Sequence, residues 1–359
     1  MTRLFIPGPT DVAPETLAAQ TRPMVGHRSQ ACTQMLGRVQ PRLREIFGTQ
    51  QRVYTLAGSG SGLQEAAVRN AVARRLLLCV GGAFAERWHD VARANGKAVD
   101  RLEVEPGRAH DPDEVARALR AGGYDALAIV HNETATGVEN PLSEIARRAR
   151  EVAPDIVILV DAVSSAGGVP LESDRWGLDV VFASSQKCLA LPPGLAFAAV
   201  SDRALERARN VPARGWYFGF VLLEQYAQHN STPSTPAISL LYALETQLER
   251  IHTEGLERRF ARHAALAARA QAWAEERFEL FAAPGFRSRT LTAVRNTRRI
   301  DVAALNAHLA EAGMVIANGY GALKNHTFRI GHMGETGLED LEALLARIEA
   351  FPGLAGAAA

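Results

Sequence analysis

The sequence predicts an α/β protein with two parts: a large domain, in which helices wrap a mostly parallel sheet, and a smaller C-terminal α+β domain. A chain of 359 residues is too long for one typical hydrophobic core. From about residue 50 to residue 200, short apolar runs alternate with amphipathic helical stretches. We expect the large domain over residues 15–245, the small domain over 246–359, and an N-terminal segment, 1–14, that packs near the functional site.

The apolar runs of the large domain are nearly continuous in Val, Ile and Leu, which is typical of strands buried on both faces. The helical stretches end in suitable residues, such as Gly96 at a helix C-cap. Strands are expected at 52–58, 76–80, 97–105, 126–133, 155–162 and 179–187, and helices at 63–75, 83–96, 111–123 and 141–154. This alternation predicts a mostly parallel sheet with helices packed against it.

The helical pattern lengthens in the C-terminal part of the chain. Two long helices are expected over 237–255 and 256–278, followed by short strands at 289–294 and 327–332. Helices mixed with a few short strands predict the smaller α+β domain.

Composition excludes several classes of function. The chain has 40 basic and 39 acidic residues and a net charge of +1, so nothing indicates a nucleic-acid or membrane-surface partner. No apolar run approaches the roughly twenty residues of a membrane span. Cys32, Cys79 and Cys188 show neither metal-type spacing nor an even disulfide framework. We expect a cytoplasmic protein without a metal site.

Lys187 stands where a buried strand ends, just before a loop stiffened by Pro192 and Pro193. A surface position is the ordinary one for lysine, whereas a lysine held directly after a core strand is well placed for chemistry. Ligands of an open parallel sheet bind beyond the carboxyl ends of its strands. The Gly/Ser loop 57–62 and Asp161 also follow expected strands at that edge. These three features define the candidate site.

The Gly/Ser loop 57–62 lies at an expected strand-to-helix turn, where backbone N–H groups and the helix dipole favour an anion. Ser59 and Ser61 add hydroxyl donors, so the loop can cradle a phosphate. A dinucleotide-binding fold would place an acidic residue at the end of the next strand, but Gly81 and Gly82 stand there. The loop also lacks the Gly-Lys-Ser/Thr of a P-loop, which disfavours nucleoside triphosphate hydrolysis.

A phosphate cradle, a carboxylate and a strand-end lysine together suit pyridoxal phosphate. The lysine forms the Schiff base, and the carboxylate pairs with the pyridine nitrogen so that the ring can accept electrons. When substrate displaces the lysine, its amine is able to move a proton. Asp161 and Lys187 stand at the ends of two consecutive expected strands, so the two groups can face each other.

Eight segments spread along nearly the whole chain point to a known family. In order they are IPGPTDVAPETL, GHRS, GSGSGLQEAA, HNETATGV, VDAVSSAGG, SSQKCLALPPG, TPAISLLYAL and FRIGHMG. With these segments the chain resembles the class V (fold type I) aminotransferases, specifically the alanine–glyoxylate and serine–pyruvate aminotransferase group. The resemblance implies pyridoxal phosphate as cofactor, Lys187 as the Schiff-base lysine and Asp161 as the partner of the pyridine nitrogen.

The resemblance also implies roles for further positions around the cofactor. Four positions match residues beside the phosphate: Ser59, Gly60, Ser61 and Gln186. Phe84 matches the aromatic that stacks on the pyridine ring, where some relatives have Trp, and Thr134 matches a hydroxyl near the ring's 3-oxygen.

The remaining matches concern the substrate and a second subunit. Arg329 matches the arginine that binds the substrate carboxylate through a bidentate fork, and Gly8 and Gly26 match positions where the backbone passes close to the substrate. Thr235 matches a residue that reaches the phosphate of the other subunit, which implies a homodimer with a shared active site. Thr232 replaces a Tyr of some relatives, so no contact is assigned to it.

The expected function is therefore a ping-pong transamination that moves the amino group of alanine or serine to glyoxylate or pyruvate. The alternatives are a lyase or desulfurase of the same fold and a non-catalytic interaction subunit. Arg329 without an obvious second basic residue favours substrates with one carboxylate, although Lys324 or Arg28 could approach a distal one. No role is assigned to His27, Arg28, His131 and His332.

Overall fold

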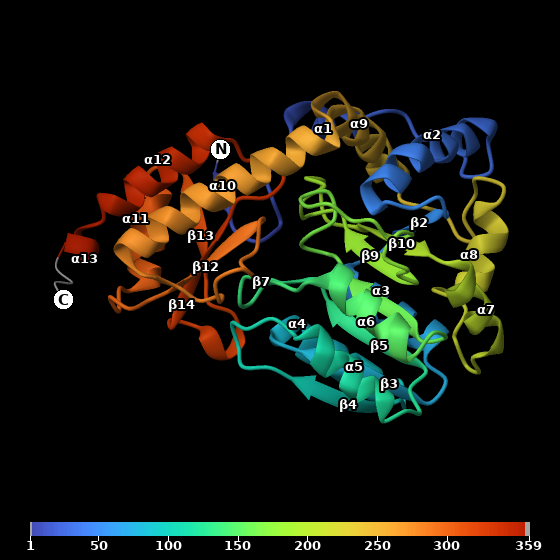
Figure 1. Cartoon of the computed structure of the whole chain (residues 1–359). Helices are drawn as coiled ribbons and strands as arrows, with labels where there is room; N and C mark the ends of the chain where they lie inside the picture. The colour runs from blue at the N-terminus through green and yellow to red at the C-terminus, as the bar shows by residue number, and fades with distance from the viewer. Residues whose placement is uncertain (1, 356–359) are drawn as a thin grey trace.

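The computed structural model describes residues 2–355 and contains two separate sheets, each with its own hydrophobic core (Figure 1). The large sheet has seven strands in the order β2-β10-β9-β8-β5-β3-β4. The smaller sheet has five strands in the order β1-β13-β14-β12-β11. The predicted α/β class is confirmed; in Figure 1, strands β12, β13 and β14 of the small sheet are drawn in orange and red, because they belong to the C-terminal part of the chain.

The large sheet is mostly parallel. Its strands are β2 (Val53–Ala57), β3 (Arg75–Val80), β4 (Ala98–Glu103), β5 (Ala126–Val130), β8 (Val157–Asp161), β9 (Val180–Ser184) and β10 (Leu195–Val200). The five strands from β9 to β4 pair in parallel. β10 is a strand beyond those expected, because the chain returns after the loop at Pro192 and pairs antiparallel with both β2 and β9.

Helices cover both faces of this sheet. Alternate residues along each strand face opposite ways, so in β8 Ile158 and Val160 join one core and Val157 and Leu159 join the other. The first core includes α2 (Gln30–Phe47), α5 (Pro112–Arg120), α6 (Leu142–Val152) and α9 (Ile238–Glu254). The second core includes α3 (Gly60–Ala71), α4 (Ala83–Ala94), α7 (Asp202–Asn210) and α8 (Phe220–Ala227). This double cover explains the continuous apolar runs.

The small sheet combines the N-terminal strand with the C-terminal part of the chain. Its strands are β1 (Arg3–Phe5), β11 (Glu279–Leu280), β12 (Leu291–Arg295), β13 (Met314–Asn318) and β14 (Thr327–Gly331). The helices and the short 3₁₀ turn around it are α10 (Leu256–Arg277), α11 (Val302–Glu311), η1 (Gly321–Leu323), α12 (Leu338–Glu349) and α13 (Pro352–Ala355). β1 pairs in parallel with β13, so the first strand of the chain belongs to the C-terminal sheet.

Two segments join the parts. α9 contacts both α2 and α1 (Pro14–Ala19), and α10 runs from there across the small sheet (Figure 1). The expected boundary at residue 245 falls inside α9 and stays a prediction. A short ribbon, β6 (Asn132–Glu133) with β7 (Val138–Glu139), follows β5. No helix between residues 2 and 355 has the length and apolar character that crossing a membrane requires.

Candidate active site

Lys187 lies in the turn after β9, under the N-terminal segment. Its Nζ donates a hydrogen bond to the Pro7 carbonyl. A Cβ placed on Gly8 would lie 2.5 Å from Lys187 Cδ, so only a glycine lets the segment pass this close to the lysine. Thr10 N donates to the Gln186 carbonyl at 3.1 Å. Burial lowers the pKa of the Lys187 ammonium to about 8, which brings its neutral form within reach near neutral pH.

Asp161 ends β8, the strand beside the one that leads to Lys187. It is opposite Phe182 of β9 in the ladder, which puts both groups at the same edge of the sheet. The buried carboxylate accepts hydrogen bonds from Gln64 Nε2 at 2.9 Å and from Val163 N at 3.0 Å. Burial raises the pKa of Asp161 to about 6, so the carboxylate is ionised above that pH.

The Gly/Ser loop forms the N-terminus of α3. Ser59 is its N-cap and accepts a hydrogen bond from Gly62 N at 3.4 Å. A Cβ on Gly60 would lie 2.6 Å from Val163 Cγ2, so the glycine allows the helix start to pack against the turn after Asp161. Unpaired N–H groups of a first helical turn bind anions. The loop is therefore an anion-binding element at the same edge as Lys187.

Phe84 lies in the first turn of α4 and belongs to a cluster that sequence reasoning missed. Its ring is nearly parallel to that of Tyr320, at 21° and 5.4 Å between centroids. Arg87 lies 4.9 Å from the Phe84 ring centre and donates hydrogen bonds to Tyr320 Oη at 2.9 Å and Ser61 Oγ at 3.2 Å. The position of Arg87, one helical turn after Phe84, is a signal in the sequence that could have predicted its place in the site. No nearby sequence pattern predicts that Tyr320 joins it.

Thr134 and Arg329 contact each other next to this cluster, since Arg329 also lies 5.5 Å from the centre of the Tyr320 ring. Thr134 is buried, and its Oγ1 lies 2.6 Å from Ser164 Oγ. The guanidinium of Arg329 donates to the Thr134 carbonyl at 3.2 Å and to the Asn318 carbonyl at 3.0 and 3.1 Å. Arg329 is 7% exposed and forms no ion pair with any described residue. Burial lowers its pKa to about 10, and a substrate carboxylate would supply the missing anionic partner.

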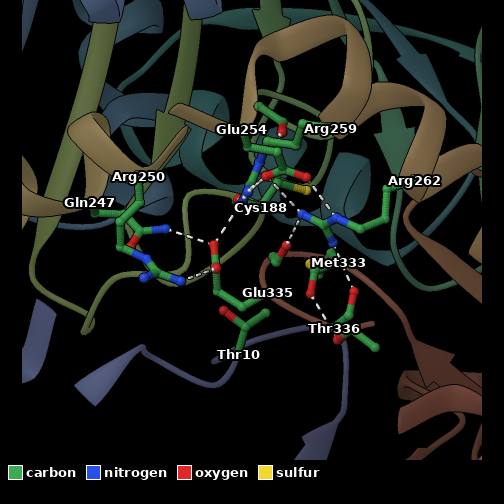
Figure 2. Close-up of polar contacts among 12 residues, drawn as sticks. Thr10, Cys188, Gln247, Arg250, Glu254, Arg259, Arg262, Met333, Glu335 and Thr336 are labelled. Carbon is green, nitrogen blue, oxygen red and sulfur yellow. Dashed lines mark hydrogen bonds and ion pairs between the residues drawn. The ribbon is translucent and has the colours of Figure 1, made fainter. Parts of the chain in front are cut away.

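An ion-pair cluster contacts Cys188, the residue that follows Lys187; Figure 2 shows Arg259 of this cluster between Glu254 and Glu335. Arg259 of α10 is fully buried, and its guanidinium donates to the carbonyls of Cys188 at 2.6 Å and Gly167 at 3.1 Å. The same group pairs with Glu254 at 2.7 Å and Glu335 at 3.2 Å. Although burial opposes ionisation of Glu335, Arg259 and neighbouring donors hold its pKa at about 2. Arg259 therefore connects the lysine turn to the small sheet.

Not every residue expected at the active site lies beside Lys187. Gly26 is exposed, and among the described residues a Cβ placed on it would meet only Ser29 within 4 Å. Thr235 lines a cavity of about 30 Å³ with Ala57 and Tyr217. Arg28 donates to Ser231 Oγ at 2.7 Å and to the Thr232 carbonyl at 2.6 Å, so it fastens that segment. A second basic residue that the sequence did not make obvious, Arg87, lies near Arg329. Arg87 and Arg329 contact the same side chain, because both lie against Tyr320.

The residues present fit pyridoxal phosphate. Lys187 supplies a buried amine, Asp161 a buried carboxylate, and the start of α3 an anion-binding turn. Two further buried atoms at this edge, Ser184 Oγ and Gln64 Oε1, have no hydrogen-bond partner among residues 2–355. A buried polar atom without a partner in the protein is able to bond to a ligand or to water. The amine, the carboxylate and the anion-binding turn therefore fit a phosphorylated pyridine with a carbonyl group, and the two unpartnered atoms leave polar contacts available beside it.

Comparison with known proteins agrees with this site. Residues 14–344 match the family model described as Aminotransferase class-V. The chain is 36% identical to an uncharacterized aminotransferase of Methanocaldococcus jannaschii, over 96% of this chain and 91% of that protein. It is 32% identical to a serine–glyoxylate aminotransferase of Methylorubrum extorquens, over 92% of this chain and 86% of that protein.

A solved structure gives the same result for the fold. The aspartate aminotransferase of Thermus thermophilus, assigned to subgroup IV, superposes with a TM-score of 0.90 at 32% identity. The superposition covers 97% of this chain and 99% of the Thermus chain. The match thus includes both sheets and the edge that carries Lys187. The chain belongs to the class-V aminotransferase family and is a pyridoxal-phosphate-dependent transaminase.

Proposed function

We propose that the protein moves the amino group of a small amino acid, alanine or serine, to glyoxylate or pyruvate. The observation that carries the proposal is the position of Lys187, a buried amine at the sheet edge that also presents Asp161 and the start of α3. Arg329, a buried arginine without an ion pair, supports a carboxylate-bearing substrate. The serine–glyoxylate enzyme of Methylorubrum supports glyoxylate as the acceptor.

The side chains divide the work as follows. When bound, pyridoxal phosphate supplies a carbonyl that condenses with amines and a ring that accepts electrons. Asp161 would pair with the ring nitrogen, and Gln64 Nε2 and Val163 N orient its carboxylate by donating hydrogen bonds to it. Lys187, whose pKa burial lowers to about 8, would hold the cofactor, and its free amine would move a proton at the substrate carbon.

Other residues bind and orient. Ser59, Gly60, Ser61 and Gln186 would hold the phosphate, Phe84 would cover the ring and Thr134 would lie near its 3-oxygen. Arg329 would bind the substrate carboxylate, while Gly8 and Gly26 would let the backbone approach the substrate. Thr235 would contact the cofactor phosphate in the active site of a second subunit.

Replacing Arg329 with methionine tests carboxylate binding. Because the carboxylate is common to donor and acceptor, kcat/KM for serine and for glyoxylate should both fall about 100-fold, which corresponds to losing roughly 3 kcal/mol of charged hydrogen bonding. The measurement is steady-state transamination with each substrate varied in turn. Arg295 in the same small sheet has an exposed side chain, so R295M is a matched control. A wild-type kcat/KM in R329M would contradict this role.

A second candidate donor is an amino acid with two carboxylates. It is favoured by Arg87, which lies at the site, bonds only to two hydroxyls and forms no ion pair with any described residue. The Thermus relative is an aspartate aminotransferase. If aspartate is the donor, kcat/KM for aspartate should exceed that for serine, and R87M should lower the aspartate value by about 10-fold or more while sparing serine. If serine is preferred, R87M should change both donors equally.

We also propose a homodimer. Trp216 and Tyr217 are 63% and 47% exposed, although large aromatic side chains are usually buried, and Tyr217 lines the same small cavity as Thr235. A second copy of the chain would cover these side chains and bring Thr235 to its partner's phosphate loop. Light scattering after size-exclusion chromatography should give about twice the chain mass of 38.7 kDa. A monomer with full activity would contradict the shared site.

We further propose a cytoplasmic location. Cys32, Cys79 and Cys188 are all buried thiols without a disulfide, which is typical of a reducing compartment. Fractionation of the producing cells should place the protein with cytoplasmic enzymes, and its recovery in a secreted fraction would contradict the proposal.

A further inference from the structure

One buried carboxylate near the site has no part in the function proposed above. Glu133, in β6, is 2% exposed and forms no ion pair with any described residue. Its carboxylate accepts hydrogen bonds only from backbone N–H groups, those of Ala135 at 3.0 Å, Phe84 at 3.2 Å and Ala85 at 3.3 Å. An uncompensated buried carboxylate is costly, so three backbone donors at one side chain indicate a defined task.

The first task is to cap α4. The N-cap residue of this helix is Gly82, which has no side chain to accept from the first turn. A Cβ on Gly82 would lie 2.5 Å from Glu133 Cγ and 2.6 Å from its Cδ, so the glycine leaves room for the incoming carboxylate. Glu133 therefore supplies the cap from a distant part of the sequence. The capped turn is the one that carries Phe84.

The second task is to hold the turn after β6. The hydrogen bond from Ala135 N closes this turn over the same carboxylate. The turn carries Thr134, whose Oγ1 lies against Ser164 and whose carbonyl accepts from Arg329. Burial raises the pKa of Glu133 to about 7. The three backbone N–H groups lower this pKa, but burial has the larger effect. One carboxylate thus joins the turns of Phe84 and Thr134.

We propose that Glu133 is a positioning residue that fixes the position of Phe84 relative to Thr134, and with it the place of the pyridine ring that these two residues would contact. The inference rests on the proposed function, because this position matters for the ring only if Phe84 and Thr134 contact the cofactor. Glu133 acts through the backbone of its two neighbours.

The test replaces Glu133 with glutamine and, separately, with aspartate. A glutamine side chain has the same shape but only one accepting oxygen, so E133Q loses either the hydrogen bonds that cap α4 or the hydrogen bond from Ala135 N. E133D keeps the negative charge, but its side chain is one methylene shorter. In both variants the dissociation constant of pyridoxal phosphate should rise about 10- to 100-fold, the range set by losing one hydrogen bond to a charged group. The visible circular dichroism of the bound cofactor should weaken, because its ring is held less rigidly. The measurements are made at pH 8, above the pKa of Glu133.

Asp111 provides the control. It caps α5 by accepting from Asp113 N at 2.7 Å, outside the site, so D111A loses a cap of the same kind. D111A should lower the unfolding midpoint but leave cofactor affinity and dichroism unchanged. If E133Q and E133D do the same, Glu133 is a structural cap only and the inference is overturned. If the wild-type protein itself fails to bind pyridoxal phosphate, the proposed function fails, and this outcome is distinct from the first.

Discussion

Replacing Lys187 with alanine is expected to abolish transamination, with a fall in kcat of roughly 10⁴-fold or more. The variant loses both the amine that holds the cofactor and the group that moves the proton. Phosphate binding at α3 does not depend on Lys187, so K187A should still bind pyridoxal phosphate, more weakly and without the absorbance of a protein Schiff base. Single-turnover amino transfer and visible absorbance measure the two effects.

The chain contains only three lysines, which makes the control simple. Lys324 is exposed, and Lys97 donates to the Ala73 carbonyl at 3.4 Å, away from the site. K324A and K97A should retain wild-type kcat within about 2-fold. If K187A keeps more than about 1% of the wild-type kcat, another group performs the proton transfer.

Replacing Arg259 with methionine should produce the largest loss of stability. The change removes the hydrogen-bond donor to the Cys188 and Gly167 carbonyls. It also removes the ion pairs that Glu254 and Glu335 form with Arg259. Breaking a buried ion pair from one side typically costs about 3–5 kcal/mol. Since both glutamates are about a fifth to a quarter exposed and keep other arginines, we expect roughly 3 kcal/mol.

Urea unfolding of the cofactor-loaded protein measures this loss, and Arg269 is the matched control on the same helix. Arg269 pairs with Glu342 at 2.6 Å, but the two side chains are 38% and 46% exposed. R269M should therefore lose about 1 kcal/mol or less. Equal unfolding free energies for R259M and R269M would show that the cluster in Figure 2 contributes no more than a surface pair.

The main architecture could be predicted because local patterns determine it. Continuous apolar runs in β3, β5 and β8 reflect burial on both faces, and that burial is visible in any short window of sequence. The strand-end positions of Asp161 and Lys187 follow from the same reasoning. β10 was missed although its run is equally apolar, since a reading built on alternating strands and helices does not anticipate an antiparallel return.

Other features could not be predicted because they depend on contacts between distant segments. β1 joins the C-terminal sheet by pairing with β13, about 310 residues away, and no local pattern records such pairing. Glu133 and Arg259 resemble ordinary surface charges in the sequence. Only the folded chain reveals that one caps a helix some fifty residues away and that the other binds the turn of Lys187.

The most direct test of the central claim is to locate the cofactor on the chain. The loaded protein is reduced with borohydride, digested, and its peptides are analysed by mass spectrometry. We expect a phosphopyridoxyl group on the peptide that contains Lys187 and on no peptide that contains only Lys97 or Lys324. A label on either of those two lysines, or no label after incubation with excess pyridoxal phosphate, would contradict the assignment of Lys187 and the active site built around it.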